Sequence, residues 1–317
     1  MRIFALLLLA HAASGFLFFG NKCQSPFSSS PKKHFFAQLW GGLFRCDYDP
    51  DEDQSLISKV GLFVRYYYIT SGQTTYSEVS ELDMGQLINP NYTNYIILHG
   101  FADGVEPDEW MEAIAKKIVT DQDANVILMD YSAISNCNYI YMAKRVAFDL
   151  AEHLAKCINR WEMNLNNTTI IGHSLGGHIA GATGTFLTQM TGQKLARIFA
   201  LDAAGPVYEV NQGLNSTCAQ FVQALHTSKI LGTSRRLGHS DFYANRDSAK
   251  QPGCFFDGCN HSRATELFYA SCFKENKFIG IDCNGSGSQS QYGLYTDGKE
   301  GCYSMPTGKC FPFTLQT

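Results

Sequence analysis

Apolar residues in this chain follow two patterns. Short runs are rich in β-branched and aromatic residues, and longer stretches repeat an apolar residue every three or four positions. The first pattern is typical of buried strands and the second of helices packed on a sheet. In chain order they predict strands at 62–70, 95–98, 126–129, 168–171, 198–201 and 221–225, with helices at 106–120, 143–161 and 179–190. Strands that alternate with helices predict a largely parallel sheet with right-handed crossovers, in an α/β fold.

The most informative motif is Gly172-His173-Ser174-Leu175-Gly176. A β-branched strand precedes it, and the small residues of 177–182 follow it, which suit close helix packing. This is the strand, sharp turn and helix of a nucleophile elbow, which exposes a serine hydroxyl on a strained turn. Glycine is needed two residues before and after the serine, because side chains there would clash where strand and helix cross. We therefore predict Ser174 as a nucleophile.

A serine nucleophile needs an adjacent base, and the base needs an orienting acid. Asp202 directly follows a predicted strand, so it lies at a carboxyl strand end, where the sites of open α/β sheets assemble. Asp241 and Asp257 are the alternatives for the acid. Of the nine histidines, His239 and His261 come late in the chain, as the order Ser, Asp, His requires.

Four ordered segments resemble the pancreatic-lipase-type family of secreted lipases over about residues 61–272; they are 97–101, 171–181, 201–206 and 259–264. The resemblance implies an α/β-hydrolase fold with the catalytic triad Ser174, Asp202 and His261. It also implies an oxyanion hole made by the backbone N–H groups of Phe101 and Leu175. One departure is Ala203, where the family usually has proline.

Segments 238–243 and 251–254 look closest to the phospholipase A1 branch, which includes insect venom enzymes. The family's disulfide-bounded lid corresponds to Cys254-Phe255-Phe256-Asp257-Gly258-Cys259, with only four residues between the cysteines, and the loop at 227–237 is also compact. A small lid leaves the site open to a polar head group. We therefore expect a phospholipase A1 that releases the sn-1 fatty acid. The alternatives are a triacylglycerol or mixed neutral-lipid lipase, and a non-enzymatic lipid-binding or yolk-type storage relative, against which the complete triad argues.

The chain has eleven cysteines, an odd number, so at least one is free or pairs between molecules. Cys157 is our candidate, because it shares an apolar helix face with Leu150 and Leu154. Cys254–Cys259 is expected from adjacency and resemblance, Cys46–Cys137 from resemblance, and Cys218–Cys272 is a third expected pair. The pairing of Cys23, Cys283, Cys302 and Cys310 stays open. Glycosylation sequons begin at Asn91, Asn166, Asn167, Asn215 and Asn284.

Arg2, an apolar run at 3–10 and small residues at 10–15 are typical of a signal peptide, with cleavage expected between residues 12 and 20. A membrane anchor needs about 20 apolar residues, and this run is interrupted too early. We therefore expect a secreted protein without a transmembrane segment. We divide it into a signal peptide (1–15), an irregular N-terminal segment (16–60), a catalytic domain (61–283) and a short disulfide-tied C-terminal extension (284–317). That extension is too short for the β-sandwich domain of pancreatic lipases.

The net charge and the pattern of possible metal ligands limit which classes of partner and cofactor we expect. A net charge of −4 offers no basic footprint for nucleic acid and argues against strong electrostatic docking onto anionic membranes. The segment 207–222 offers only Glu209 as an acidic ligand for the family's calcium site, and no His/Cys cluster has zinc spacing. We expect no metal or cofactor. The expected partner is a lipid substrate, met peripherally at a membrane or lipid interface, and the oligomeric state is left open.

Overall fold

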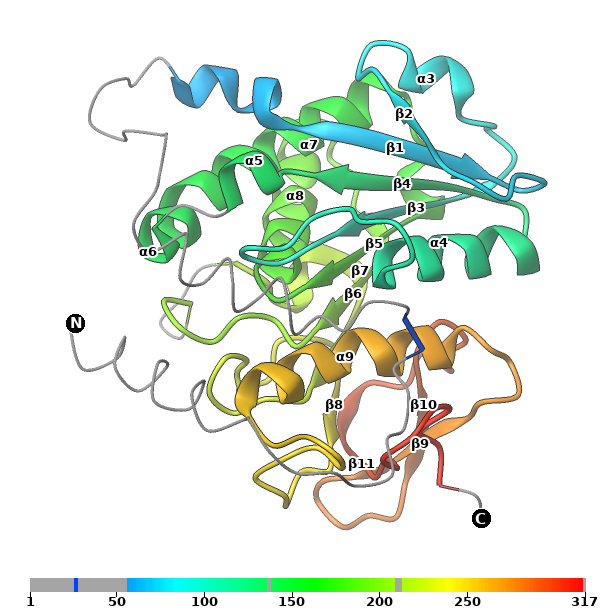
Figure 1. Cartoon of the computed structure of the whole chain (residues 1–317), viewed down its shortest axis with the longest axis vertical. Coiled ribbons are helices and arrows are strands. Elements are labelled where there is room, and N and C mark those ends of the chain that lie inside the picture. The colour runs from blue at the N-terminus through cyan, green and yellow to red at the C-terminus, as the bar shows by residue number, and fades with distance from the viewer. Residues whose placement is uncertain (1–25, 28–55, 136–137, 209–212, 316–317) are drawn as a thin grey trace.

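A mixed sheet with helices on both faces organises the protein (Figure 1). The computed structural model describes residues 26–27, 56–135, 138–208 and 213–315. The strand order is β10-β9-β11-β8-β7-β6-β5-β3-β4-β1-β2. The strands are β1 (Arg65–Thr70), β2 (Ser77–Val79), β3 (Thr93–Leu98), β4 (Ala124–Asp130), β5 (Thr168–His173), β6 (Leu195–Leu201), β7 (Ala219–His226), β8 (Ser240–Ala244), β9 (Phe278–Asp282), β10 (Gln289–Tyr292) and β11 (Gly301–Met305).

Neighbouring strands from β11 through to β4 run parallel. The strands at the two edges are antiparallel: β1 and β2 on one side, β9 and β10 on the other. Strands β4 and β5 are buried along their whole length, as expected of central parallel strands covered on both faces. The carboxyl ends of the parallel strands therefore share one edge of the sheet.

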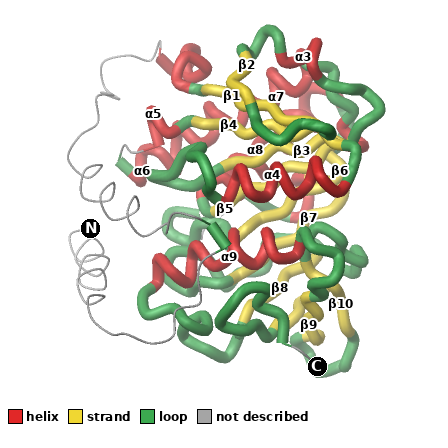
Figure 2. The backbone as a smooth tube through the Cα atoms, turned by 45° about the vertical axis from the view of Figure 1, so that its right-hand side comes forward, coloured by secondary structure: helices red, strands yellow, loops and turns green. Residues whose placement is uncertain are grey.

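Side chains of the central strands β3 to β7 alternate between two hydrophobic cores, one on each face. In β3, Ile96 joins the core under α7 (Ala147–Arg160) and α8 (Leu175–Thr191), and Ile97 joins the core under α4 (Trp110–Asp121) and α9 (Asp257–Ser271). Figure 2 shows α4 and α9 in front of the sheet. The shorter helical segments are η1 (Leu56–Phe63), α3 (Met84–Leu87), α5 (Ser132–Ser135), α6 (Tyr139–Tyr141), η2 (Met142–Val146), η3 (Leu165–Asn167) and η4 (Ser216–Cys218).

The structure contains every strand and helix that the hydrophobic pattern predicts, with shifted ends. The helix expected at 143–161 begins with a π-helical turn, η2, before α7. Strands β8 to β11 were not predicted. Two of them, β10 and β11, lie in the segment expected to be a C-terminal extension, and β11 pairs in parallel with β8. That segment therefore continues the central sheet.

The cysteines differ from expectation at one pair. Cys218 and Cys272 do not form a disulfide; both are buried free thiols. The reason is their position, because Cys218 belongs to the core under α8 and Cys272 to the core on the opposite face. Disulfides join Cys254 to Cys259 and Cys283 to Cys302. Cys157 is a buried free thiol on α7.

Several expectations fall outside the described residues. These are the signal peptide, most of the N-terminal segment 16–60, Cys23, and the pair Cys46–Cys137. Among the helices that the structure describes, none combines the length and the apolar character needed to cross a bilayer.

Candidate active site

The turn between β5 and α8 holds Ser174 in a strained conformation. Its backbone has φ 54° and ψ −119°, a region that non-glycine residues rarely adopt. Such a conformation typically costs about 1–3 kcal/mol and persists only where its surroundings enforce it. Here the Ser174 N–H donates to Leu201 O at 3.0 Å, and its carbonyl accepts from the N–H groups of Gly177 and Ala204 at 3.1 and 3.2 Å. The elbow is thus bonded to its own helix and to the end of β6.

Close packing explains the two glycines of the motif. A Cβ on Gly172 would collide with the carbonyl of Gly176. A Cβ on Gly176 would lie 2.5 Å from His99 O and 2.6 Å from Leu98 O. The first turn of α8 therefore packs directly on the backbone at the ends of β5 and β3, which brings the His99–Phe101 loop beside the serine.

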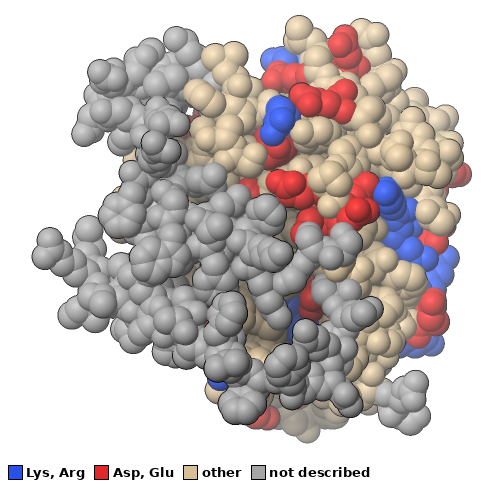
Figure 3. Space-filling model, in the orientation of Figure 1, with Lys and Arg blue, Asp and Glu red and all other residues tan. Residues whose placement is uncertain are grey.

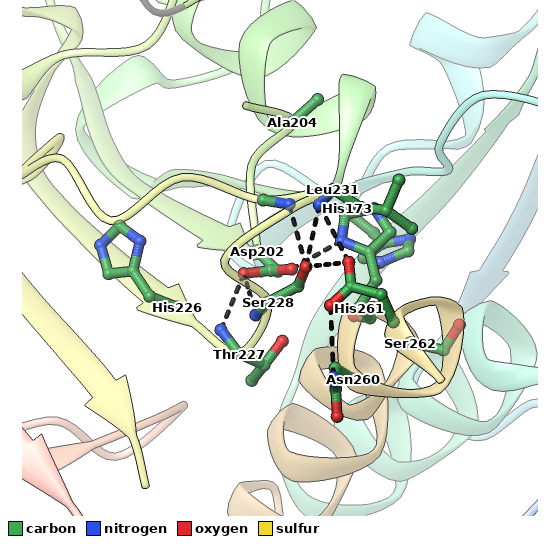
Figure 4. A network of polar contacts seen from close by, with 12 residues as sticks. His173, Asp202, Ala204, His226, Thr227, Ser228, Leu231, Asn260, His261 and Ser262 are labelled. Carbon is green, nitrogen blue, oxygen red and sulfur yellow. Dashed lines mark hydrogen bonds and ion pairs between the residues drawn. The ribbon is translucent and has the colours of Figure 1, made fainter. Parts of the chain in front are cut away.

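Asp202 follows β6 and is fully buried, with a fixed partner for each carboxylate oxygen. Oδ2 accepts a hydrogen bond from His261 Nδ1 at 2.6 Å. Oδ1 accepts from the backbone N–H groups of Thr227 at 2.7 Å and Ser228 at 3.1 Å, which follow the neighbouring strand β7 (Figure 4). The carboxylate is therefore oriented by the main chain and not only by the histidine.

His261 lies in the second turn of α9 and is buried. Its Nδ1–H faces Asp202, which leaves Nε2 as the ring atom able to take a proton. Its backbone carbonyl accepts a hydrogen bond from His173 Nε2 at 3.3 Å, and the two rings lie 4.7 Å apart between centroids. His173 thus ties the elbow to the turn of α9 that carries the base. Within the described residues, the Ser174 hydroxyl makes no hydrogen bond to a protein group, so Asp202 and His261 are the two members of the expected triad that are joined.

Of the two N–H groups expected to form the oxyanion hole, that of Leu175 directly follows Ser174, and that of Phe101 follows Gly100, which packs against Ser174. Leu175 is the first residue of α8, where an N–H has no partner within the helix. Gly100, just before Phe101, lies so close that a Cβ on it would be 3.0 Å from Ser174 Cβ. The Gly100 carbonyl lies 2.9 Å from His99 Nδ1, and Tyr131 N–H donates to His99 Nε2 at 3.1 Å, so Nδ1 is the donor. His99 therefore holds the peptide group that contains the Phe101 N–H.

The segment expected to be a lid is closed by the Cys254–Cys259 disulfide and runs into α9. Phe255 is 75% exposed, whereas Phe256 is half-buried. Asp257 Oδ2 accepts hydrogen bonds from Ser228 Oγ at 2.6 Å and from Leu231 N–H at 3.0 Å. Ser228 therefore contacts the lid through its hydroxyl and Asp202 through its backbone N–H.

The alternatives for the acid and the base have other partners. Asp257 bonds to the loop after β7, and Asp241 Oδ1 lies 2.9 Å from His226 Nε2. The His239 ring accepts from Val222 N–H. His178, near the elbow on α8, lies between Ala204 O and Leu214 N–H, and burial lowers its pKa to about 4. Among the described residues, none of these four side chains forms a hydrogen bond with the side chain of Asp202 or Ser174.

Sequence reasoning missed the residues that position the candidate site, namely Thr227 and Ser228 beside Asp202 and His99 beside the expected oxyanion hole. The available signal was their place in the chain, since each follows a parallel strand that neighbours the strand of Ser174 or of Asp202.

The face drawn in Figure 3 presents mixed charge over its described part, with acidic side chains across the upper centre and Lys and Arg along the right-hand margin.

Comparison with known proteins places this geometry in a family. The family model described as Lipase matches residues 69–311. Lipase member H from Rattus norvegicus is 32% identical over 80% of this chain and 57% of its own length. Pancreatic lipase-related protein 2 from Cavia porcellus is 30% identical over 75% of this chain and 58% of its own length. Phospholipase A1 from Vespa velutina is 30% identical over 58% of this chain and 66% of its own length.

The matched part of this chain thus spans less than two thirds of each of these relatives. The family match nevertheless covers most of the chain and includes the elbow, the acid and the base. The sheet, the elbow and the chain order Ser174, Asp202, His261 are those of an α/β hydrolase. This chain belongs to the lipase family.

Proposed function

We propose that this protein is a serine carboxylester hydrolase that acts on lipids through an acyl-enzyme on Ser174. The observation that carries the proposal is the buried Asp202–His261 pair, joined at 2.6 Å, beside a serine held on a strained elbow. A neutral serine hydroxyl is a weak nucleophile, and a histidine oriented by a carboxylate is the usual means of activating it.

The proposed reaction has two steps. In the first, His261 Nε2 takes the proton of Ser174 Oγ, the oxygen attacks the ester carbonyl, and the imidazolium returns the proton to the leaving alcohol. In the second, His261 Nε2 takes a proton from the water that attacks the acyl carbon, and gives it to Ser174 Oγ as the bond between Ser174 and the acyl group breaks and the fatty acid leaves. The N–H groups of Phe101 and Leu175 stabilise the tetrahedral oxyanion; losing one such donor typically raises the barrier by about 2.7–4 kcal/mol.

Within this class we propose phospholipase A1 activity that releases the sn-1 fatty acid. The support is the short disulfide-closed lid, which offers one exposed aromatic side chain, Phe255, and little apolar surface to cover a triglyceride. A wasp phospholipase A1 is among the relatives. The second candidate is a neutral-lipid lipase, favoured by the similarity to a pancreatic lipase-related protein.

We also propose that the protein is secreted and glycosylated. The disulfides Cys254–Cys259 and Cys283–Cys302 fit an oxidising compartment. Asn91, Asn166, Asn215 and Asn284 are exposed and Asn167 is half-buried, so these sequons are accessible. Asn260-His261-Ser262 also matches the sequon pattern, but Asn260 is buried. Mass spectrometry of the secreted protein before and after glycan removal tests this: unmodified asparagines at all five sequons would overturn glycosylation.

Product analysis tests the reaction. Phosphatidylcholine with different acyl chains at sn-1 and sn-2 is offered beside a triglyceride, with Ser174→Ala as the control. We expect release of the sn-1 acid and a 2-acyl lysophospholipid by the wild type only. Strong triglyceride hydrolysis with negligible phospholipid cleavage supports the neutral lipase instead. No hydrolysis, together with no organophosphate adduct on Ser174, supports a lipid-binding role.

Phe255 allows a separate test of interfacial binding. Burying a phenylalanine side chain at an interface stabilises docking by about 1.5–3 kcal/mol. Phe255→Ser should therefore weaken vesicle binding roughly 10- to 150-fold while leaving turnover of a short soluble ester unchanged. The matched control is Leu62→Ser, which replaces a 78% exposed apolar residue on η1. Equal vesicle affinity in the two variants would show that Phe255 does not contribute to membrane binding.

A further inference from the structure

Three side chains with metal-binding atoms converge away from the triad. They are Glu81, in the turn between β2 and α3, and His153 and Cys157 on α7. His153 Nε2 lies 3.2 Å from Glu81 Oε2 and 3.6 Å from Cys157 Sγ. His153 and Cys157 are four residues apart on the helix, which places them on the same face. Glu81 comes from a distant segment, so no spacing in the sequence could reveal the cluster.

The two distances from His153 Nε2 match the edges of a tetrahedral coordination shell, and all three ligand atoms lie within 4.8 Å of one another. With bonds of about 2.0–2.1 Å to nitrogen and oxygen and about 2.3 Å to sulfur, tetrahedral ligands lie about 3.3 Å apart for N and O and about 3.6 Å for N and S. The same nitrogen, Nε2, faces both Glu81 and Cys157. A Cys–His–acid relay would instead use the two ring nitrogens for its two partners. The arrangement therefore favours one shared cation over an activated thiol.

Neighbouring groups hold these ligands in place. Tyr66 OH donates to Cys157 Sγ at 3.6 Å, and Trp161 Nε1 donates to the Glu81 backbone carbonyl at 2.8 Å. Arg160 contacts Oε1 of Glu81, which leaves Oε2 directed at His153. Such outer contacts commonly orient metal ligands and raise affinity.

A cation can reach the site from solvent. The thiolate is the ligand form of cysteine, so the metal displaces the thiol proton of Cys157 when it binds. The side chains of His153 and Glu81 are 16% and 25% exposed, which gives a cation and one water a route to the buried sulfur.

We propose that Glu81, His153 and Cys157 form a binding site for a thiophilic divalent cation of the Zn²⁺ class, with water as the fourth ligand. The site ties the turn after β2 to α7. It uses no residue of the triad, so it is independent of the proposed hydrolysis.

The experiment uses the full chain after chelator treatment, titrated with Co²⁺ and with Zn²⁺. We expect Co²⁺ to produce a thiolate charge-transfer band in the near ultraviolet, and Zn²⁺ to raise the melting temperature. Cys157→Ala should lose the band, and the matched control Cys272→Ala, which removes another buried free thiol, should keep it. His153→Gln retains the thiol and should bind Zn²⁺ at least tenfold more weakly.

Circular dichroism establishes that each variant is folded before its titration. The proposal is overturned if the wild type gives no thiolate band, or if folded His153→Gln binds Zn²⁺ as tightly as the wild type. Ester hydrolysis should be the same with and without Zn²⁺, so failure of this site and failure of the proposed hydrolase are separate results.

Discussion

Replacing Asp202 by asparagine should abolish turnover, because it moves the ring proton of His261 from Nδ1 to Nε2. The Oδ1 position faces two backbone N–H donors, from Thr227 and Ser228. Asparagine must place its carbonyl oxygen there, because an amide N–H₂ would oppose those donors. Its N–H₂ then takes the Oδ2 position, 2.6 Å from His261 Nδ1, and donates to it. The ring proton is left on Nε2, so Nε2 cannot accept the proton of Ser174.

The magnitude follows from this wrong tautomer. In serine hydrolases an aspartate-to-asparagine change of this kind lowers kcat by about 10⁴-fold, which is about 5 kcal/mol of barrier. Stability should change little, because both backbone donors keep an acceptor. Asp202→Ala should destabilise the fold, because it leaves two buried N–H groups unpaired, which costs about 1–3 kcal/mol of stability each. It lets His261 adopt either tautomer.

The assay compares kcat on a short soluble ester with the free energy of unfolding in urea for both variants. We expect Asp202→Asn to be at least as inactive as Asp202→Ala and clearly more stable. Asp202→Asn turnover within tenfold of the wild type would refute the orientation argument. An Asp202→Asn variant less stable than Asp202→Ala would show that the two backbone donors do not fix the side chain.

Three further predictions concern the elbow and its supports. Ser174→Ala should lower kcat on the soluble ester by about 10⁴–10⁶-fold with an unchanged melting temperature; wild-type turnover would exclude Ser174 as the nucleophile. Gly176→Ala should lower both activity and melting temperature, because its Cβ would lie 2.5 Å from His99 O; a wild-type melting temperature would contradict the packing argument. His178 has a folded pKa of about 4 against about 6.5 in unfolded chains, so the unfolded state takes up its proton first on acidification. Stability should therefore fall by about 3 kcal/mol between pH 6.5 and pH 4, and urea unfolding should show a smaller fall for His178→Gln; equal falls would contradict this.

The sequence predicted best where local chemistry and position in the chain agree. Ser174 stands out because only a sharp turn between strand and helix requires glycine on both sides of it. Asp202 could be placed because it ends a strand. Ser228 could not be predicted, because its role depends on β7 lying beside β6, and a local sequence pattern does not determine strand order. The edge strand β10 was missed because three of its four residues are polar, which leaves little apolar signal.

The wrong disulfide has a similar cause. Whether a cysteine lies on one face of a sheet or the other depends on packing and register, which spacing along the chain does not give. Cys218 and Cys272 are each plausible core residues, and only the three-dimensional structure shows that the sheet separates them. The cluster of Glu81, His153 and Cys157 shows the reverse case, in which residues distant in sequence meet.

The hydrogen bond between Ser228 and Asp257 has a mechanical consequence. Asp257 and His261 are one turn apart on α9, so the lid and the base belong to one rigid body. An outward swing of that turn would break the bond to Ser228 and pull His261 from Asp202 in the same motion. This segment should therefore stay in one position at the edge of the site and should not open and close over it. If the proposed lipid hydrolysis is correct, the substrate enters past this segment, and turnover should begin without the lag that a closed entrance would impose.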